Sequence, residues 1–508
     1  MLKRLLLLTL AAVLCAHGVS AQTLTPTLQS APSIFDPVGP PDDLLGKYAA
    51  LGADDEQTTV VAKSGEKRAC DGCPRRRIGT SFLQVTYVNG IYELANLIRG
   101  QDTAHITPKT WWTNMKRGWE WDLDEFVVNQ FGHPYQGNNY YTTGRANGLS
   151  FWESAALTAF GSGTWEFFGE TNQASLNDFI NTTMGGIALG EMLHRTAWLI
   201  LDPTATGGSR KKKEIFATAI DPMNGINRFI SGDAHRVSEK PAEFTPSSLA
   251  ATTAAGVLWR GSNTEDVESA AYPSVQVDLL YGDPTTGRSR TPYDAFGVRF
   301  DFGGGTAISE IRVRGRLLGQ PYKDGALQLM VAQGYQFNKN PAYWFGAESV
   351  ETSVSTTRQL SPTFSFWTGV WGGVTILGAV DSVPPPGVDS PVPEPGEDAG
   401  QGVSTGPRFY DYGPGTNFGG IFNLRHRSMD LITFSYEAHQ LHVLDGVRCN
   451  HFLQRAGAYL DVPVKGRLGI GAAGEFFDRR TFYQTPGVPR AHFHFPQFRA
   501  FLTWSSAS

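Results

Sequence analysis

LITFSYEAHQLHVL, residues 431–444, contains the alternation that decides the fold. The apolar positions are Ile432, Phe434, Tyr436 and Ala438, and the polar positions between them are Thr433, Ser435, Glu437 and His439. Successive side chains of a β-strand point to opposite faces, so a period of two predicts an extended strand. The stretch therefore predicts a strand with one apolar face and one polar face.

The same alternation recurs through the C-terminal half of the chain, in segments separated by Gly, Pro, Asp and Asn. The further candidates are residues 275–279, 296–302, 308–316, 325–337, 342–351, 363–371, 417–426, 451–464, 468–476 and 491–504. Many of these segments have the length of about 9 to 11 residues that a tilted membrane strand needs. Together they predict eleven strands, and a transmembrane antiparallel β-barrel of about 10 to 14 strands is the expected fold.

The polar faces of these strands distinguish a membrane barrel from a soluble β-sandwich, which is the alternative. The charged residues and the histidine predicted to point into the lumen are Arg299, Asp301, Arg312, Arg314, Arg316, Glu437 and His439. A sandwich buries one face of each strand in a dry core, whereas a membrane barrel turns its apolar face to lipid and tolerates charge inside. The length and number of the strands favour the barrel.

The last predicted strand carries two further signals. It ends in aromatic and apolar residues at 501–504, close to the chain terminus, as outer-membrane barrels tend to do. Its apolar positions shift from odd to even numbers around Pro496, and a β-bulge at that proline would account for the shift.

Composition agrees with a mainly β protein. Among the 508 residues 41% are hydrophobic, 12% are aromatic and 18% are charged, and the formal net charge is -5. So much apolar material excludes a disordered chain, and the acidic balance argues against a general nucleic-acid partner. No uncharged apolar run reaches the roughly 18 residues that a membrane-spanning helix requires.

The N-terminus predicts export. Lys3 and Arg4 precede an apolar run at residues 5–14, and small residues follow before Gln22, which fits a signal peptide cleaved before that glutamine. The expected location is the outer membrane of a diderm bacterium. The expected partners are its lipid and the machinery that assembles barrels, and no cofactor is expected.

The chain divides into four regions, of which the first is the signal peptide. These are a signal peptide (1–21), a flexible N-terminal arm (22–77), a Trp-rich segment with a helical module (78–260) and the barrel strands (274–504), which a Pro-rich mobile loop (381–408) interrupts.

The cysteines of the exported chain predict one small loop. Cys70 and Cys73 lie in a segment rich in Gly, Pro and Arg, and export favours oxidation, so they are expected to form a disulfide. Cys449 is then left as a free thiol.

Two helices are predicted in the middle region. The first spans residues 150–169, where Ser, Thr and Glu recur every four positions. The second spans residues 175–201, with Ser175 as its cap and Asp178 reaching back to complete a capping box. Small residues recur every four positions on the second helix, so the polar row of the first helix is expected to pack into that groove.

The polar residues of this region allow two interpretations. In the catalytic one, His133 is a general base, Glu166 or Asp178 orients it, and Arg145 is an oxyanion or phosphate partner. In the structural one, the arginines neutralise the acids in a buried network. The members of that network would be Arg145, Glu166, Glu170, Thr182, Glu191 and Arg195, and Asp178 would serve only as the capping-box acid. No metal site is predicted, because no second histidine lies at ligand spacing from His133.

A resemblance to a known family covers about residues 82–233. It is carried by an HPxxG element at His133, a WExxxE element at Trp165 and an SxxD element at Ser175, together with Arg145 and Arg195. In this combination the segment resembles an uncharacterised family of exported bacterial proteins, domain of unknown function 3943. The resemblance implies an outer-membrane protein and brings no activity with it.

Two functions therefore stay open on the sequence. One is a structural or channel-like barrel with the helical module packed in or under it. The other is a membrane-embedded hydrolase or transferase that acts on envelope lipid through the cluster of His133, Arg145, Glu166 and Asp178.

Overall fold

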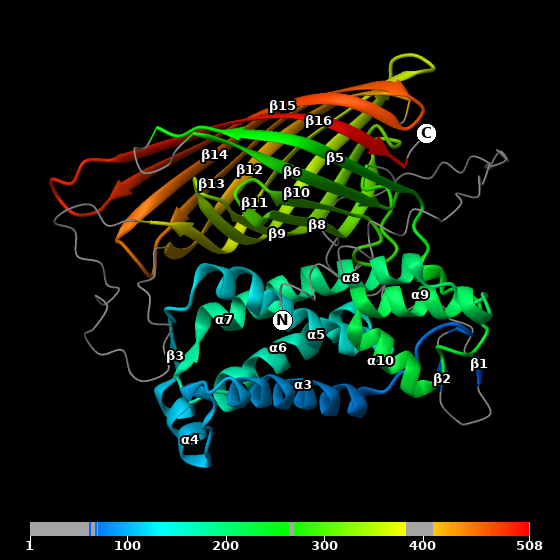
Figure 1. The fold of residues 1–508 in the computed structure, drawn as a ribbon, viewed down its shortest axis with the longest axis vertical. Helices are drawn as coiled ribbons and strands as arrows, with labels where there is room; N and C mark the ends of the chain where they lie inside the picture. The colour runs from blue at the N-terminus through cyan, green and yellow to red at the C-terminus, as the bar shows by residue number, and fades with distance from the viewer. Residues whose placement is uncertain are drawn as a thin grey trace, which may run out of the picture.

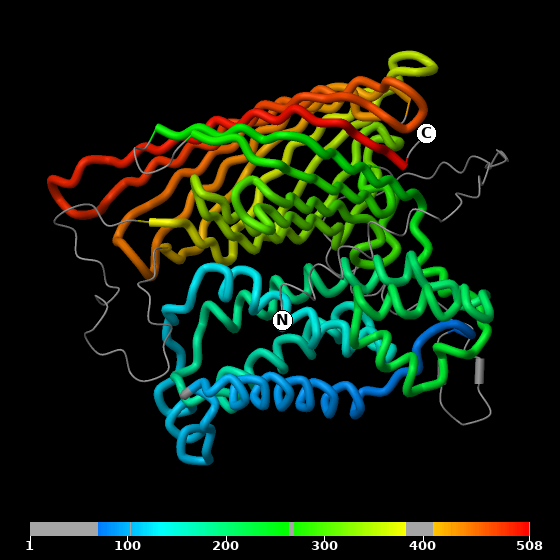
Figure 2. The backbone as a smooth tube through the Cα atoms, viewed as in Figure 1, coloured from blue at the N-terminus to red at the C-terminus, as the bar shows by residue number. Residues whose placement is uncertain are grey.

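The computed structural model has two main parts, a barrel of strands and a layer of helices beside it (Figures 1 and 2). It describes residues 60–61, 67–68, 70–263, 269–285, 287–382, 410–427 and 429–506. The predicted signal peptide and most of the predicted Pro-rich loop lie outside the described residues.

The barrel consists of twelve strands in the closed order β10-β11-β12-β13-β14-β15-β16-β5-β6-β7-β8-β9. Its strands are β5 (Leu249–Arg260), β6 (Ala270–Tyr281), β7 (Phe296–Gly303), β8 (Thr306–Tyr322), β9 (Leu327–Lys339), β10 (Trp344–Gln359), β11 (Phe364–Asp381), β12 (Tyr410–His426), β13 (Met429–His442), β14 (Cys449–Lys465), β15 (Leu468–Tyr483) and β16 (Ala491–Ser505). Every neighbouring pair is antiparallel, and β16 pairs with β5 to close the sheet. The predicted fold class, a transmembrane antiparallel β-barrel with a helical insertion, is confirmed.

One strand was not predicted. β5 lies inside the region expected to belong to the helical module, so the barrel begins at Leu249 and not at residue 274. The sequence of β5, LAATTAAGVLWR, consists largely of small residues. It therefore shows little alternation between hydrophobic and polar positions.

The predicted bulge at Pro496 is absent. The register between β15 and β16 is continuous from Leu468↔Trp504 to Thr481↔Ala491, and Pro496 stands opposite Phe476 within it. The apparent shift arises because Phe495 points into the lumen, where it packs beside Tyr343 and Phe477. Aromatic residues on the lumen face, and not an extra residue, therefore disturbed the alternation.

The two faces of the barrel wall differ as a membrane barrel requires. Large apolar side chains are exposed on the outer face of β5 and of β11 to β16, among them Val257, Val370, Val374, Phe418, Phe434, Val462, Ile470, Phe498 and Leu502. The alternate positions carry charged and polar residues that contact one another across the lumen. Apolar residues outside and charges inside are the arrangement of a barrel in lipid.

The helical module contains more helices than the two predicted. It consists of α3 (Ile78–Ile98), α4 (Pro108–Arg117), α5 (His133–Ala146), α6 (Phe151–Phe168), α7 (Leu176–Ile180), α8 (Gly186–Ile200), α9 (Gly207–Ile220) and α10 (Pro222–Ser231), with 3-10 turns η1 (Asp102–Ala104) and η4 (Ala242–Phe244) and π-turns η2 (Val128–Gly132) and η3 (Asn181–Gly185). The short pairs β1 (Val60–Val61) with β2 (Lys67–Arg68) and β3 (Trp119–Glu120) with β4 (Ala174–Ser175) lie outside the barrel. No helix in the described part of the chain is long and apolar enough to cross a membrane.

Both predicted helices exist. α6 corresponds to the first, with Ser150 and Glu153 forming a capping box, and α7, η3 and α8 follow one another as the second. The missed helix α5 contains Asn, Tyr, Thr and Gly that are almost all buried. An amphipathic pattern cannot reveal a helix whose whole surface is covered.

The module packs against the outer wall of the barrel, which corrects the expectation that it would lie in or under the barrel. Ile187, Leu189 and Met192 of α8 share a core with Ile311 and Val313 of β8 and with aromatic residues of β9. The residue between them, Arg312, points into the lumen toward Glu437, so the wall residues that α8 covers face outward. Figure 1 shows α8 next to the strands and α3 on the far side of the module.

The cysteine prediction is confirmed. Cys70 and Cys73 form a disulfide, and Cys449 is a free, buried thiol at the start of β14.

Candidate functional site

The predicted catalytic residues separate into two clusters. His133 begins α5 and Arg145 lies in its last turn, so twelve helical steps of 1.5 Å put them about 18 Å apart along the helix. The set of His133, Arg145, Glu166 and Asp178 is therefore not one site. Arg145 takes part in a separate ion-pair network.

The first cluster surrounds His133. Its Nε2 lies 3.5 Å from Oδ1 of Asp178, and its Nδ1 lies 3.3 Å from the hydroxyl of Thr182. Asp122 completes a group of His133, Asp122 and Asp178 whose ligand atoms lie within 4.8 Å of one another. Burial lowers the pKa of His133, and Asp122 opposes this only in part, so the imidazole is held neutral.

Two asparagines bind the carboxylates of this cluster. Asn177 donates to Asp122 at 2.8 Å and to Asp178 at 2.9 Å, and Asn129 donates to Asp122 at 2.7 Å. The π-turn η2, which places Asn129 one turn before His133, is a local irregularity of the kind often found at functional sites. Asp122 is the residue of this cluster that the sequence analysis missed.

Three acids in and around the cluster, Glu166, Glu170 and Asp178, have raised pKa values. Burial, reinforced by Asp124 and Asp122, raises the pKa of Glu170 to about 8. Burial also raises the pKa of Glu166 and of Asp178, and nearby acids add to both shifts. These carboxyl groups are therefore kept largely neutral and do not form the predicted ion pairs with arginine.

The cap of the second helix differs in one respect from the prediction. The Ser175 hydroxyl accepts from the Asp178 N–H at 3.3 Å, as expected. The Ser175 N–H, however, donates to Glu166 at 2.8 Å, so Glu166 takes the place predicted for the Asp178 side chain. Asp178 is thereby free to face His133.

The second cluster is an ion-pair network centred on Glu191. Arg145 and Arg195 donate to its two oxygens at 2.9 and 2.8 Å, and Tyr141 donates at 2.9 Å. Glu243 contacts both arginines from the outer side. Burial alone would raise the pKa of Glu191, but the two arginines lower it to about 2. The structural interpretation is thus supported for Arg145, Glu191 and Arg195.

Close helix contacts hold both clusters in place. Gly186 of α8 lies against the backbone of Gly137 in α5, and Gly190 lies against the ring of Tyr141, where a Cβ would collide. The groove of small residues on the second helix therefore receives α5 and not α6, which corrects the predicted packing. Ser154 of α6 contacts α5 at Gly144.

The His133 cluster can orient protons and is well buried. His133 and Asp178 are both less than a tenth exposed. One pocket is lined by residues of the barrel lumen and another by residues near α10, and neither is lined by His133, Glu166 or Asp178. The described geometry thus places an imidazole with a lowered pKa beside carboxyl groups with raised pKa values.

Fold and site together define the protein as a transmembrane β-barrel with a helical module on its wall. Within that class, residues 118–223 match the model of the family described as Domain of unknown function (DUF3943). The match confirms the predicted resemblance, and it covers both clusters except for Glu243. A search of curated protein sequences finds no match.

Among solved structures, the chain is similar to several outer-membrane proteins at very low identity. The KdgM porin in complex with disordered oligogalacturonate is 4% identical with a TM-score of 0.23, over 50% of this chain and 98% of that one. An outer membrane channel from Pseudomonas putida F1 is 10% identical with a TM-score of 0.23, over 52% and 100%. The outer membrane protease OmpT from Escherichia coli is 9% identical with a TM-score of 0.16, over 51% and 97%. At such scores these likenesses carry no argument, and the barrel class depends on the strand order itself.

The Glu191 network makes a stability prediction. Glu191→Gln leaves two buried guanidinium groups with the partly exposed Glu243 as their one common counter-charge, and we expect it to lower the free energy of unfolding by about 3 to 5 kcal/mol. The exposed pair of Arg76 and Glu153 supplies the control, since Arg76→Ala should cost about 1 kcal/mol or less. Urea unfolding in detergent micelles, followed by tryptophan fluorescence, measures both. Equal losses for the two variants would contradict a structural role for Glu191.

Proposed function

We propose that this protein is a structural barrel of the outer membrane, closed to solutes, that carries its helical module against the lipid-facing wall. The closed antiparallel sheet with exposed apolar residues outside supports the membrane location. The predicted signal peptide fits export to that membrane.

Ion pairs across the lumen are the observation that supports its closure. Arg455 of β14 donates to Glu310 of β8 at 3.0 and 2.9 Å, and six steps in the closed strand order separate these strands, so the pair joins opposite walls of the barrel. Arg312 of β8 pairs with Glu437 of β13 at 3.1 Å. Ion pairs between opposite walls occupy the space through which a solute would pass.

The space between these pairs is small. A pocket in the lumen is bounded by Arg312, Glu437 and Arg455 and by the aromatic pair of Tyr343 and Phe477. Barrels of about 16 to 18 strands leave a water-filled channel, whereas side chains fill the interior of much smaller barrels. With twelve strands and paired charges across it, this lumen resembles the filled type.

The closure predicts the electrical behaviour of the purified protein. We expect planar bilayers containing the wild-type chain to show no steady ion conductance. The double variant Arg312→Ala with Arg455→Ala removes the crossing pairs and should conduct measurably. Arg425→Ala, which breaks an exposed pair with Asp430 near the end of β12, is the matched control and should stay closed. Heat-modifiable migration on gels verifies folding of each variant, and steady conductance by the wild type would overturn the closed barrel.

The outer surface of the module supports lipid as its partner. The exposed positions of α3 form a stripe of apolar and small residues without a charge: Ile78, Gly79, Phe82, Leu83, Thr86, Tyr87, Gly90, Ile91, Leu94, Leu97 and Ile98. Its inward face mixes Ser81, Gln84 and Asn89 with the buried valines Val85 and Val88. An outer face that is apolar and uncharged suits a helix whose surroundings are hydrocarbon. The module lies beside a wall that itself faces lipid, so acyl chains are the occupant that we assign to this stripe.

The lipid assignment is tested by fluorescence quenching. A fluorophore on Ile91→Cys should be quenched by vesicles of phosphatidylcholine with brominated acyl chains. A fluorophore on Lys211→Cys, which is exposed on the charged face of α9, should be quenched much less. Equal quenching at the two sites would remove lipid as the partner, and a dimer found by light scattering would assign the stripe to a second copy.

A second candidate function is an envelope hydrolase or transferase. It is favoured by the meeting of His133 with Asp178 and Asp122 inside the module. If it is correct, His133→Ala combined with Glu166→Gln should change the lipid profile of the host envelope while the barrel still migrates as folded. An unchanged lipid profile would reject the enzymatic function and leave the structural function as the remaining candidate.

A further inference from the structure

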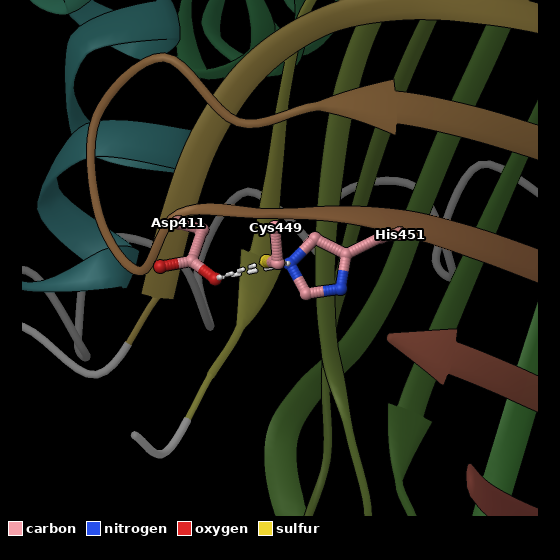
Figure 3. A group of neighbouring side chains, drawn as sticks. All are labelled: Asp411, Cys449 and His451. Carbon is pink, nitrogen blue, oxygen red and sulfur yellow. Dashed lines mark hydrogen bonds and ion pairs between the residues drawn. The ribbon is translucent and has the colours of Figure 1, made fainter. Parts of the chain in front are cut away.

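Three residues that no part of the sequence analysis connected meet at one end of the barrel. Asp411 lies at the start of β12, and Cys449 and His451 lie on β14. Cys449 and His451 are two positions apart, so their side chains share the lumen face of the strand. Figure 3 shows the carboxylate of Asp411 and the imidazole of His451 directed at the sulfur of Cys449.

The three donor atoms have the separations of a metal-ligand set. Nε2 of His451 lies 3.0 Å from Oδ2 of Asp411 and 3.4 Å from Sγ of Cys449, and that sulfur lies 3.7 Å from the same oxygen. Metal bonds of about 2.0 to 2.3 Å at tetrahedral angles place such atoms about 3.3 to 3.6 Å apart. Small shifts of the side chains would suffice to hold an ion.

In both Asp411 and His451, the polar side-chain atom that does not face the sulfur has a hydrogen-bond partner. That partner fixes the orientation of the side chain. Nδ1 of His451 lies 3.0 Å from the Thr481 hydroxyl, and Oδ1 of Asp411 accepts from the Val447 N–H at 2.8 Å. These contacts leave Nε2 and Oδ2 turned toward the sulfur. Partners of this kind on the far atom of a ligand are characteristic of metal sites, where they set ring orientation and basicity.

The loop between β13 and β14 closes over the group. Gly446 has a φ of 122°, which side chains rarely adopt, and a Cβ on it would collide with the Asp411 carboxylate. Asp411, Cys449 and His451 are 3%, 0% and 1% exposed, so the group is shielded from bulk water. A carboxylate and a thiolate that are buried side by side repel each other. A divalent cation bound between them offsets that repulsion.

We propose that Asp411, Cys449 and His451 form a binding site for a divalent transition-metal ion, with Zn²⁺ the best match. One sulfur, one imidazole nitrogen and one carboxylate oxygen are all zinc ligands, and the thiolate disfavours Mg²⁺ and Ca²⁺. Binding releases the thiol proton to solvent. Three protein ligands leave the fourth tetrahedral position to water or to a small ligand. The site does not depend on the closed lumen or on the lipid surface proposed above.

The test is a measurement of bound metal on the full chain in detergent. The protein is stripped with EDTA, dialysed with equimolar Zn²⁺ and analysed by mass spectrometry for the metal. We expect about one zinc per chain for the wild type, and at least a tenfold loss of affinity for Cys449→Ser and His451→Gln. Thr481→Val, which removes only the partner of Nδ1, should weaken binding by about 10- to 100-fold. Loading with Co²⁺ should give a thiolate-to-metal absorption band that disappears in Cys449→Ser.

Two controls separate this site from the other groups in the chain. His442→Gln alters an exposed histidine on the neighbouring strand and should keep the zinc. Asp178→Asn alters the cluster at His133 and should keep it as well. Heat-modifiable migration confirms that every variant is folded. A wild type without stoichiometric zinc, or zinc lost in Asp178→Asn and retained in Cys449→Ser, would overturn the proposal.

Discussion

Pairing of the last strand with the first is the interaction on which the rest of the structure depends. In hydrocarbon every backbone N–H and C=O must find a partner within the protein, so an open sheet edge is excluded. β16 meets β5 from Gln497↔Arg260 to Ser505↔Thr252, and this contact completes the ring. Once the ring is closed, each strand has one face toward the lumen and one face away from it. The lumen network and the wall that receives the helices both follow from that division.

Ion pairs with buried members gather in two enclosed places, the lumen and the helical module. In the lumen, Arg455 and Glu310 reach each other from opposite walls. In the module, Glu191 lies between Arg145 and Arg195. In both places each ion is paired at hydrogen-bond distance, which is the condition under which buried charge is tolerated. The His133 cluster follows a different rule, because burial and neighbouring acids raise the pKa of Asp178 and of the nearby Glu166 and Glu170.

Much of the barrel could be predicted from the sequence, because its strands are half-buried and show their two faces as a period of two. Leu431–Leu444 is such a case, and most of it forms β13 with Glu437 and His439 in the lumen. β5 escaped prediction because it is built largely from Ala, Thr and Gly. α5 escaped because it is buried on all sides. For the site, the composition of the Arg145, Glu191 and Arg195 network could be predicted, but its separation from His133 could not.

The sequence by itself determined the local structure: the alternating strands, the serine caps of two helices and the Cys70–Cys73 disulfide, each of which depends on residues close together in the chain. Only the tertiary structure decided that the module lies against the outer wall, since that position depends on the fit of α8 to distant strands. The tertiary structure also decided that Asp411 meets Cys449 and His451. Thirty-eight residues separate Asp411 from Cys449, and strand register alone brings them together. Local periodicity encodes secondary structure, whereas the placement of side chains across a closed sheet follows from pairing and packing between residues far apart in sequence.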